Sequence, residues 1–396
     1  MDNSMLREIS EGINTPAYVF SGDEFRKRAE DTVAVLGTDI HICYSIKANP
    51  FLLTMLPECF SNVEVCSPGE LEICIAAGVD PSMIIYSGLN KGADDVKRAL
   101  SYGAGLITAE SRHHLDLIEN AASEAGVRAD VLVRASAGSQ FGIDRNELAQ
   151  ILVDHKDYPS ISFAGVHFFT GTQKRKAREI VKETGFLRRW IEELREKSGL
   201  ELRKIEYGTG LPAYMFRDRD MDCLEDAHAA EMAFLGEIST ALKELAEVCD
   251  LTIEMGRFFA ESCGHYFTKV VDAKNNEGID YAIIDGGSHQ IRYFGQMQGM
   301  QCPFISHISD SADGDTVPWT LCGSLCTTAD VLARNAEFTG LKTGDTLVFH
   351  QAGAYALYEC MSLFLSRDLP SVYGLDEKGL TLLRGRKESY SFNYPL

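Results

Sequence analysis

The chain has 396 residues, of which 45% are hydrophobic, enough to bury the cores of one large α/β domain and a smaller second domain. The formal charge of −20 argues against nucleic acid and anionic membranes as partners, because the mean field of the protein repels both. The first residues lack the basic and then apolar pattern of a signal peptide, and no apolar run is long enough to cross a bilayer. We therefore expect a cytoplasmic protein that acts on small molecules.

The eleven cysteines are odd in number, and none forms a Cys-x-x-Cys pair. Most lie in apolar segments, as Cys66 and Cys74 do, which is typical of reduced thiols in a core. Cys59 lies near these two in the sequence, but no histidine stands at ligand spacing from them. We predict no metal site.

Between residues 25 and 260, short β-rich runs alternate with helical stretches. The helical stretches have apolar residues at i, i+3 and i+4, and Gly78, Gly103 and Gly126 are C-cap signals at the ends of three of them. Eight strand-and-helix units over about 235 residues are typical of a (β/α)8 TIM barrel. A doubly wound open sheet is the alternative, because a count of strands does not show closure. The β-rich runs are residues 40–46, 63–66, 83–87, 106–109, 131–134, 163–169, 204–207 and 251–254, and the helical stretches include 71–77, 93–101, 112–124 and 181–197.

The pattern changes after Arg257. The β-rich pieces become shorter, and turn signals such as Asn276-Glu277-Gly278 separate them, which predicts an appended C-terminal β-barrel-like domain. The segment 16–20 precedes the first helix, and we expect it to add a strand to that domain. The expected division is a barrel over residues 25–262 and a β domain formed by residues 1–24 plus 263–396. The β-rich pieces are residues 265–271, 281–284, 318–322 and 346–349.

Unusual residues gather where the predicted barrel strands end, which is where TIM barrels place their catalytic groups. Each has a structural explanation when it is taken singly. A strand-end lysine can reach solvent, a histidine can be satisfied in the core, a Gly-Thr-Gly segment can be only a turn, and Glu254 can form a local ion pair with Arg257. Their shared location favours one ligand that uses them all. The residues are Lys47 after the first strand, Arg134 at the end of the fifth, His167 and Phe169 on one face of the sixth, Thr172 after it, Gly208 and Gly210 after the seventh, and Glu254 and Arg257 at the eighth.

Pyridoxal phosphate is a ligand that needs these groups together. A lysine amine binds its aldehyde as a Schiff base, and a flat side chain covers its ring. A carboxylate such as Glu254 keeps the ring nitrogen protonated and so strengthens the ring as an electron sink. Arg257 and the backbone amides around Gly208 and Gly210 suit the phosphate.

The motifs that carry these residues resemble those of a known family. Over nearly its whole length the chain is similar to the pyridoxal-phosphate-dependent decarboxylases of the diaminopimelate and ornithine decarboxylase family, which have the alanine-racemase-like barrel of fold type III. The segment 44–49 resembles the family's cofactor-lysine motif, and segment 254–257 its Glu-Pro-Gly-Arg. The other matching segments are 67–71 (SPGEL), 139–142 (SQFG), 323–326 (GSLC) and 353–355 (GAY).

The resemblance implies roles for individual residues. Lys47 would be the Schiff-base lysine, Glu254 would contact the ring nitrogen, and Cys326 would serve the cofactor of the partner subunit in a homodimer with shared active sites. We expect Cys326 to be the acid that reprotonates Cα; as a structural residue it would be a small apolar core side chain. The other expected cofactor contacts are Arg134, His167, Phe169, Thr172, Gly208, Gly210, Arg257 and Tyr355.

Two departures from the family pattern concern the substrate. Phe169 stands where the family has a histidine that stacks on the ring, so stacking is retained and hydrogen bonding is lost, while His167 matches the motif's other histidine. Thr327 stands where the amine-recognising enzymes have an Asp or Glu for the distal ammonium. With His289 and Arg292 as further expected substrate contacts, the distal group is expected to be neutral or anionic.

This combination predicts a decarboxylase that removes the α-carboxylate of an amino acid or amino-acid conjugate unlike plain ornithine or lysine. It resembles the divergent branch that acts in siderophore and antibiotic biosynthesis on citryl-diamine or carrier-tethered glutamyl substrates. The alternatives are a diaminopimelate decarboxylase, a racemase, a catalytically silent regulatory homologue and an unrelated barrel enzyme. The basic cluster 174–178 (KRKAR) is either a site for substrate carboxylates or a carrier protein's phosphopantetheine, or a solvated helix face.

Overall fold

The computed structural model describes residues 1–309 and 313–395. It divides into two compact units. The barrel unit comprises Lys27–Pro212 and Ala230–Phe259, and the second unit comprises Met1–Arg26, Ala213–Ala229 and Ala260–Leu396. The division expected from the sequence differs mainly in the segment Ala213–Ala229, which groups with the second unit.

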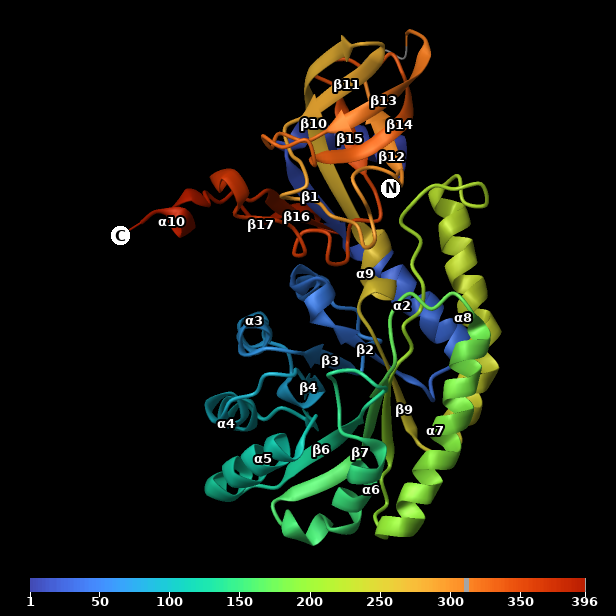
Figure 1. Cartoon of the computed structure of the whole chain (residues 1–396), viewed down its shortest axis with the longest axis vertical. Coiled ribbons are helices and arrows are strands. Elements are labelled where there is room, and N and C mark those ends of the chain that lie inside the picture. The colour runs from blue at the N-terminus through green and yellow to red at the C-terminus, as the bar shows by residue number, and fades with distance from the viewer. Residues whose placement is uncertain (310–312, 396) are drawn as a thin grey trace. The chain divides into compact units, whose positions relative to one another are not determined.

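The barrel unit contains a closed barrel of eight parallel strands among the described residues, in chain order from β2 to β9. The predicted TIM barrel is confirmed, and the open sheet is excluded because β9 pairs with β2. Figure 1 shows α3, α4 and α5 on the outer side of the strands. The strands are β2 (His41–Ser45), β3 (Asn62–Val65), β4 (Ile84–Tyr86), β5 (Leu106–Ala109), β6 (Ala129–Ala135), β7 (Ile161–Phe169), β8 (Lys204–Gly208) and β9 (Asp250–Met255).

Three helices end at the glycines that the sequence predicts, whereas α3 and α7 begin before the expected residues 71 and 181. Ser67 and Ser111 cap the N-termini of α3 and α5 by accepting hydrogen bonds from the backbone amides of residues 70 and 114. Gly78, Gly103 and Gly126 end α3, α4 and α5 in the left-handed conformation, with φ of 72°, 94° and 65°. The helices of this part of the chain are α2 (Gly22–Leu36), α3 (Pro68–Ala77), α4 (Ala93–Tyr102), α5 (Arg112–Ala125), α6 (Arg145–Val153), α7 (Ala177–Ser198), α8 (Leu224–Ala246) and α9 (Arg257–Ala260).

The barrel interior changes character along its axis. Cys43, Ile85 and Leu132 form an apolar cluster contributed by β2, β4 and β6. Two residues further along β2, Ser45 is also buried, and the strands beside it carry the buried carboxyl groups of Glu64 and Glu254. Because side chains two apart share a face of a strand, the polar layer lies on the C-terminal side of the apolar one.

The second unit is built on a nine-stranded mixed sheet within the described residues. As the sequence predicts, β1 joins this sheet, antiparallel to β10 and parallel to β16. Helix α1 (Asn3–Gly12) packs Leu6 and Ile9 against Val19, Phe267 and Val348 of the sheet. The strands are β1 (Ala17–Ser21), β10 (Gly264–Asn276), β11 (Ile279–Ile284), β12 (Ile305–Ile308), β13 (Thr316–Cys322), β14 (Val331–Thr339), β15 (Thr346–Phe349), β16 (Ser371–Asp376) and β17 (Gly379–Arg384), and helix α10 spans Tyr390–Asn393.

No helix in the described ranges combines the length and the apolar character that a bilayer crossing requires.

Candidate functional site

Lys47 lies immediately after β2, in a short 3-10 turn, and points at carboxyl groups from both neighbouring strands. Its Nζ is 2.6 Å from Glu64 Oε2 on β3 and 3.6 Å from Glu254 Oε1 on β9. The lysine side chain is 37% exposed, whereas those of Glu64 and Glu254 are only 2% and 9% exposed. The lysine therefore reaches the polar interior of the barrel. A strand-end lysine that extends only into solvent does not describe this geometry.

Ser45 joins the two carboxyl groups beneath Lys47, because its Oγ is hydrogen-bonded to both Glu64 and Glu254. A hydroxyl carries one proton, so it donates to one carboxylate, and the second contact needs a proton on the other carboxyl group. Burial alone would raise the pKa of Glu64, but the Lys47 ammonium and hydrogen bonds from Lys47 and Ser45 lower it. Burial and the charge of Glu64 raise the pKa of Glu254. The shared proton is therefore favoured on Glu254 over Glu64.

Glu206 on β8 is a third buried carboxyl group in the same polar layer, beside His167 on β7. Burial and the charges of Glu64 and Glu254 raise the pKa of Glu206 well above its usual value, which favours its neutral form. Burial and the nearby Arg134 guanidinium lower the pKa of His167 to about 3, so the imidazole is neutral as well. Among the described residues, neither ring nitrogen of His167 and neither oxygen of Glu206 has a hydrogen-bond partner. His167 is thus not a satisfied core histidine.

The end of β8 and the loop after it leave no room for side chains at two glycines. A Cβ on Gly208 would lie 2.6 Å from Phe169 Cδ2 and 3.0 Å from Glu254 Oε2. A Cβ on Gly210, whose φ is +65°, would lie 2.0 Å from the carbonyl oxygen of Gly171. Both positions therefore require glycine. The structure brings Phe169, Gly208 and Glu254 together on neighbouring strands, in register.

The loop that contains Thr172 is hydrogen-bonded to the loop that contains Gly210. The backbone N–H of Lys174 donates to the carbonyl oxygen of Gly210 at 2.9 Å. The Thr172 side chain is exposed beside these loops, and the buried Thr209 hydroxyl has no hydrogen-bond partner among the described residues. Backbone amides at glycines and free hydroxyls are the groups that bind a phosphate, so this pair of loops fits the phosphate of the expected cofactor.

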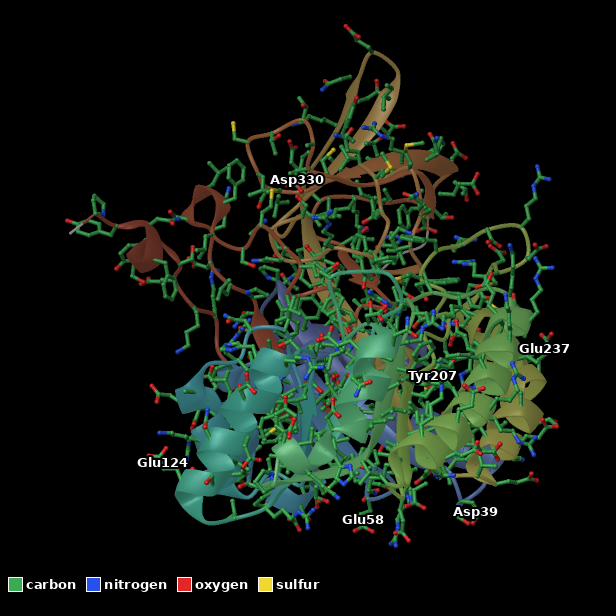
Figure 2. All side chains as sticks on the ribbon, turned by 60° about the horizontal axis from the view of Figure 1, so that its bottom comes forward. Asp39, Glu58, Glu124, Tyr207, Glu237 and Asp330 are labelled. Carbon is green, nitrogen blue, oxygen red and sulfur yellow. The ribbon has the colours of Figure 1, made fainter. Side chains whose placement is uncertain are left out.

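Glu183 on α7 holds this loop in place. Its carboxylate accepts hydrogen bonds from Thr170 Oγ1 at 2.7 Å, Lys174 Nζ at 2.6 Å and the Tyr207 hydroxyl at 2.5 Å. Tyr207, labelled in Figure 2, lies on β8, directly before Gly208. One carboxylate thus joins the β7–α7 loop, α7 and β8. We call these four residues the Glu183 clamp.

The two arginines expected to contact the cofactor occupy different surroundings. Arg134, at the end of β6, donates from Nη1 to Glu110 Oε1 at 3.0 Å, and its guanidinium lies 4.5 Å from the centre of the Phe141 ring. Arg257 is buried and begins α9 directly after β9. Glu110 keeps the charge of Arg134 balanced, so Arg134 is oriented by the protein before any ligand binds.

The other expected residues belong to the second unit. Cys326 is exposed and Thr327 is partly exposed in the loop between β13 and β14, and His289 is buried at 2% exposure. Asp330 joins their two segments by accepting hydrogen bonds from the backbone N–H groups of Ser288 at 2.7 Å and of Leu325 at 2.8 Å. The structure therefore brings the His289 segment and the Cys326 loop together. Arg292 is exposed, and Tyr355 has a positive φ of 64°.

Sequence reasoning missed Glu64, Glu206 and the Glu183 clamp. Glu64 and Glu206 were visible as charged residues inside apolar β-rich runs, two positions before Cys66 and Gly208 on the same face. That spacing signals an inward carboxyl group once a barrel is assumed. Glu183 has no such signal, because it looks like an ordinary polar residue of an amphipathic helix.

Residues 22–261 match the family model described as "Pyridoxal-dependent decarboxylase, pyridoxal binding domain". The diaminopimelate decarboxylase of Pseudomonas aeruginosa is 28% identical over 373 residues, which cover 88% of this chain and 85% of the relative. The L-glutamyl-[BtrI acyl-carrier protein] decarboxylase of Niallia circulans is 25% identical over 400 residues, which cover 93% of this chain and 91% of the relative.

Solved structures with the same fold include the diaminopimelate decarboxylase of Helicobacter pylori complexed with L-lysine. It has a TM-score of 0.83 and 21% identity, and the match covers 98% of each chain. At this identity the likeness shows the fold. The family match is independent of it and spans more than half of the chain. The chain belongs to the pyridoxal-dependent decarboxylases, and it is an enzyme whose cofactor is pyridoxal phosphate.

Proposed function

We propose that the enzyme removes the α-carboxylate of an amino acid whose distal end carries a second carboxylate, with diaminopimelate as the first candidate. The Lys47 cluster, in which one amine faces Glu64 and Glu254, carries the decarboxylase chemistry. The curated relatives support the substrate, since several are diaminopimelate decarboxylases at 24–28% identity. They favour this alternative over the amino-acid conjugates that the sequence alone suggested.

The cofactor supplies an aldehyde for the substrate amine and a ring that accepts the electrons left when CO₂ departs. In our proposal Lys47 holds the aldehyde carbon, Glu254 faces the ring nitrogen, and Phe169 covers the ring. Gly208, Gly210, Thr172, Arg257 and Tyr355 are proposed to hold the phosphate, and Arg134 and His167 to line the site.

The charge pattern of the polar layer suits this arrangement. One ionised carboxylate, Glu64, faces the one ammonium, Lys47, while burial favours the neutral form of Glu206. The proton on Glu254 is then available to a ring nitrogen, and keeping that proton nearby favours the electron-accepting form of the ring. The contact of 2.6 Å between Glu64 Oε2 and Lys47 Nζ also orients the amine before a ligand binds.

A carrier-bound glutamyl group is the second candidate substrate. After Cys326 the chain continues with Thr327, Thr328 and Ala329, so the first carboxylate of this loop is Asp330. Asp330 is buried and already accepts hydrogen bonds from two backbone amides. A distal ammonium lacks a partner in this loop, which favours a neutral or anionic distal group. The relative from Niallia circulans supports this candidate.

Release of CO₂ from a panel of substrates tests the proposal. The panel contains diaminopimelate, ornithine, lysine, citryl-diamine and glutamate bound to a carrier protein. We expect diaminopimelate to give the largest kcat/KM. A larger value for carrier-bound glutamate would select the second candidate, and Cα–H exchange in deuterated water without CO₂ would refute decarboxylation in favour of racemisation.

Borohydride reduction tests the role of Lys47 separately. Reduction of the cofactor-loaded enzyme should attach the cofactor to Lys47, and Lys47→Ala should abolish the label. Binding of cofactor without this label, together with no CO₂ release from any substrate, would instead favour a catalytically silent homologue.

We also propose that the enzyme is a homodimer in which Cys326 acts in the active site of the partner subunit. The exposed position of the Cys326 side chain supports this assignment, since a residue that serves another subunit must be accessible. Mixing tests it, because Lys47→Ala and Cys326→Ala subunits should complement each other only if sites are shared.

A further inference from the structure

A large basic pocket lies on the barrel unit, formed by the β7–α7 loop, the first residue of α6 and one side of α7. Its volume is about 950 Å³. Two acidic side chains, Glu179 and Glu183, also line it. The basic residues that line it are Arg145, Lys174, Arg175, Lys176, Lys182 and Arg189. The pocket therefore carries a formal excess of four positive charges, in a chain whose total is −20.

Most of these basic side chains form no ion pair with the residues that the structure describes. Lys174 is paired, since its Nζ is 2.6 Å from Glu183 Oε2. Within residues 1–309 and 313–395, no ion pair joins Arg145, Lys176, Lys182 or Arg189 to a carboxylate. Elsewhere on the barrel unit, acidic side chains such as Glu124 and Glu237 extend outward from α5 and α8 (Figure 2). An anion in this pocket would meet uncompensated cations.

The pocket is distinct from the cluster centred on Lys47. Its lining includes neither Lys47 nor the Gly208–Gly210 segment, and it shares only the loop residues around Thr172 with the proposed phosphate site. Part of its wall is fixed, because the guanidinium of Arg145 lies 5.1 Å from the centre of the Phe186 ring. Arg145, Lys176, Lys182 and Arg189 are exposed, so their charged ends are accessible to a ligand from solvent.

We propose that this pocket binds a phosphate-bearing ligand with at least two negative charges. Four cations that form no ion pair with the described residues match a multiply charged group, and guanidinium and ammonium donors together suit phosphate oxygens. The volume exceeds that of a phosphate alone, so the ligand has an organic body that packs along Phe186 and the lysine stems. The phosphate is either that of a free metabolite or one carried by the tether of a substrate. The inference holds whichever amino acid is decarboxylated.

Calorimetric titration of the holoenzyme tests the proposal, with the cofactor already bound so that its own phosphate site is filled. The probes are inorganic pyrophosphate for the free source and 4′-phosphopantetheine for the tethered source. The test variant is Lys182→Gln with Arg189→Gln, and the matched control is Lys197→Gln, an exposed lysine in the last turn of the same helix.

We expect at least one probe to bind, and its Kd should rise with ionic strength. The Kd should also rise about tenfold or more in the double variant but less than about twofold in the control. Tighter binding of 4′-phosphopantetheine supports the tethered source, and tighter binding of pyrophosphate the free source. The proposal is overturned if neither probe binds at millimolar concentration, or if the double variant binds as wild type does. Because heat is measured without turnover, these outcomes do not depend on decarboxylase activity.

Discussion

Replacing Glu183 with Gln is expected to loosen both loops that hold the cofactor phosphate. The substitution keeps the shape of the side chain but removes the negative charge of the carboxylate, which accepts hydrogen bonds from Thr170, Lys174 and Tyr207. The Lys174 and Glu183 side chains are 7% and 18% exposed, so the ammonium would be left nearly buried without a counter-charge. Removing one partner of such a pair costs about 3–5 kcal/mol, and we expect about 3 kcal/mol here because Lys174 can partly reach water.

Urea denaturation of the holoenzyme measures the loss of stability, and titration of the apoenzyme with pyridoxal phosphate measures the effect on the loops. The apparent Kd should rise about tenfold, or about 1.4 kcal/mol, because Lys174 also fastens its loop to Gly210 through its backbone. Lys174→Met combined with Glu183→Gln should lose less than the sum of the single variants, with a coupling energy of about 1–3 kcal/mol.

Arg188→Gln is the matched control on the same helix. Arg188 is 42% exposed and lies 3.7 Å and 3.8 Å from the exposed carboxylates of Glu244 and Glu247. Its loss should change stability by less than about 0.5 kcal/mol and leave cofactor affinity unchanged. An equal effect of the control, or additive effects of the two clamp substitutions, would refute the assignment of Glu183 as the residue that positions these loops.

Three further substitutions have defined outcomes. Gly210→Ala should weaken cofactor binding more than tenfold in the same titration, because its Cβ would lie 2.0 Å from the Gly171 carbonyl oxygen. Glu206→Gln should change the free energy of unfolding at pH 7 by less than about 1 kcal/mol, since burial and the neighbouring charges favour the neutral carboxyl group; a large loss would show that it is ionised. For Glu24, burial favours a higher pKa, but His265 and the N-terminal ammonium lower it to about 2. Its ionised form therefore stabilises the protein above the usual pKa of 4.5, and this stabilisation is lost as the pH falls toward 2. Urea curves should show wild type losing about 1–2 kcal/mol more than Glu24→Gln between pH 5 and pH 3, after allowance for its 28% exposure.

The strand and helix pattern was predictable because each element carries its own local signal. Serine and glycine at the ends of α3 and α5 mark helix boundaries through backbone hydrogen bonds that do not depend on distant residues. Closure of the barrel had no local signal, since it depends on β9 pairing with β2 more than 200 residues earlier. The transfer of Ala213–Ala229 to the second unit is likewise a matter of long-range contacts.

The residue types that surround the cofactor were predictable from the sequence, but the list of residues was incomplete. Lys47 and Glu254 stood out because strand ends rarely carry buried charges, and the structure brings them within 3.6 Å. Their relationship to Ser45 and Glu64 required the register between β2, β3 and β9, which no single stretch of sequence contains. The substrate side was harder, because Thr327 signals only the lack of a carboxylate and does not identify what replaces it.

The three carboxyl groups beneath Lys47 show why a list of site residues does not determine the chemistry. If Glu64, Glu206 and Glu254 were all ionised, one ammonium would face three buried negative charges, and repulsion in a low-dielectric interior would cost several kcal/mol. Lys47 is closest to Glu64, so the charge is favoured on Glu64 and protonation is favoured on the other two. The lysine thus decides the protonation of its surroundings, and in our proposal it leaves a proton on the carboxyl group that faces the ring nitrogen.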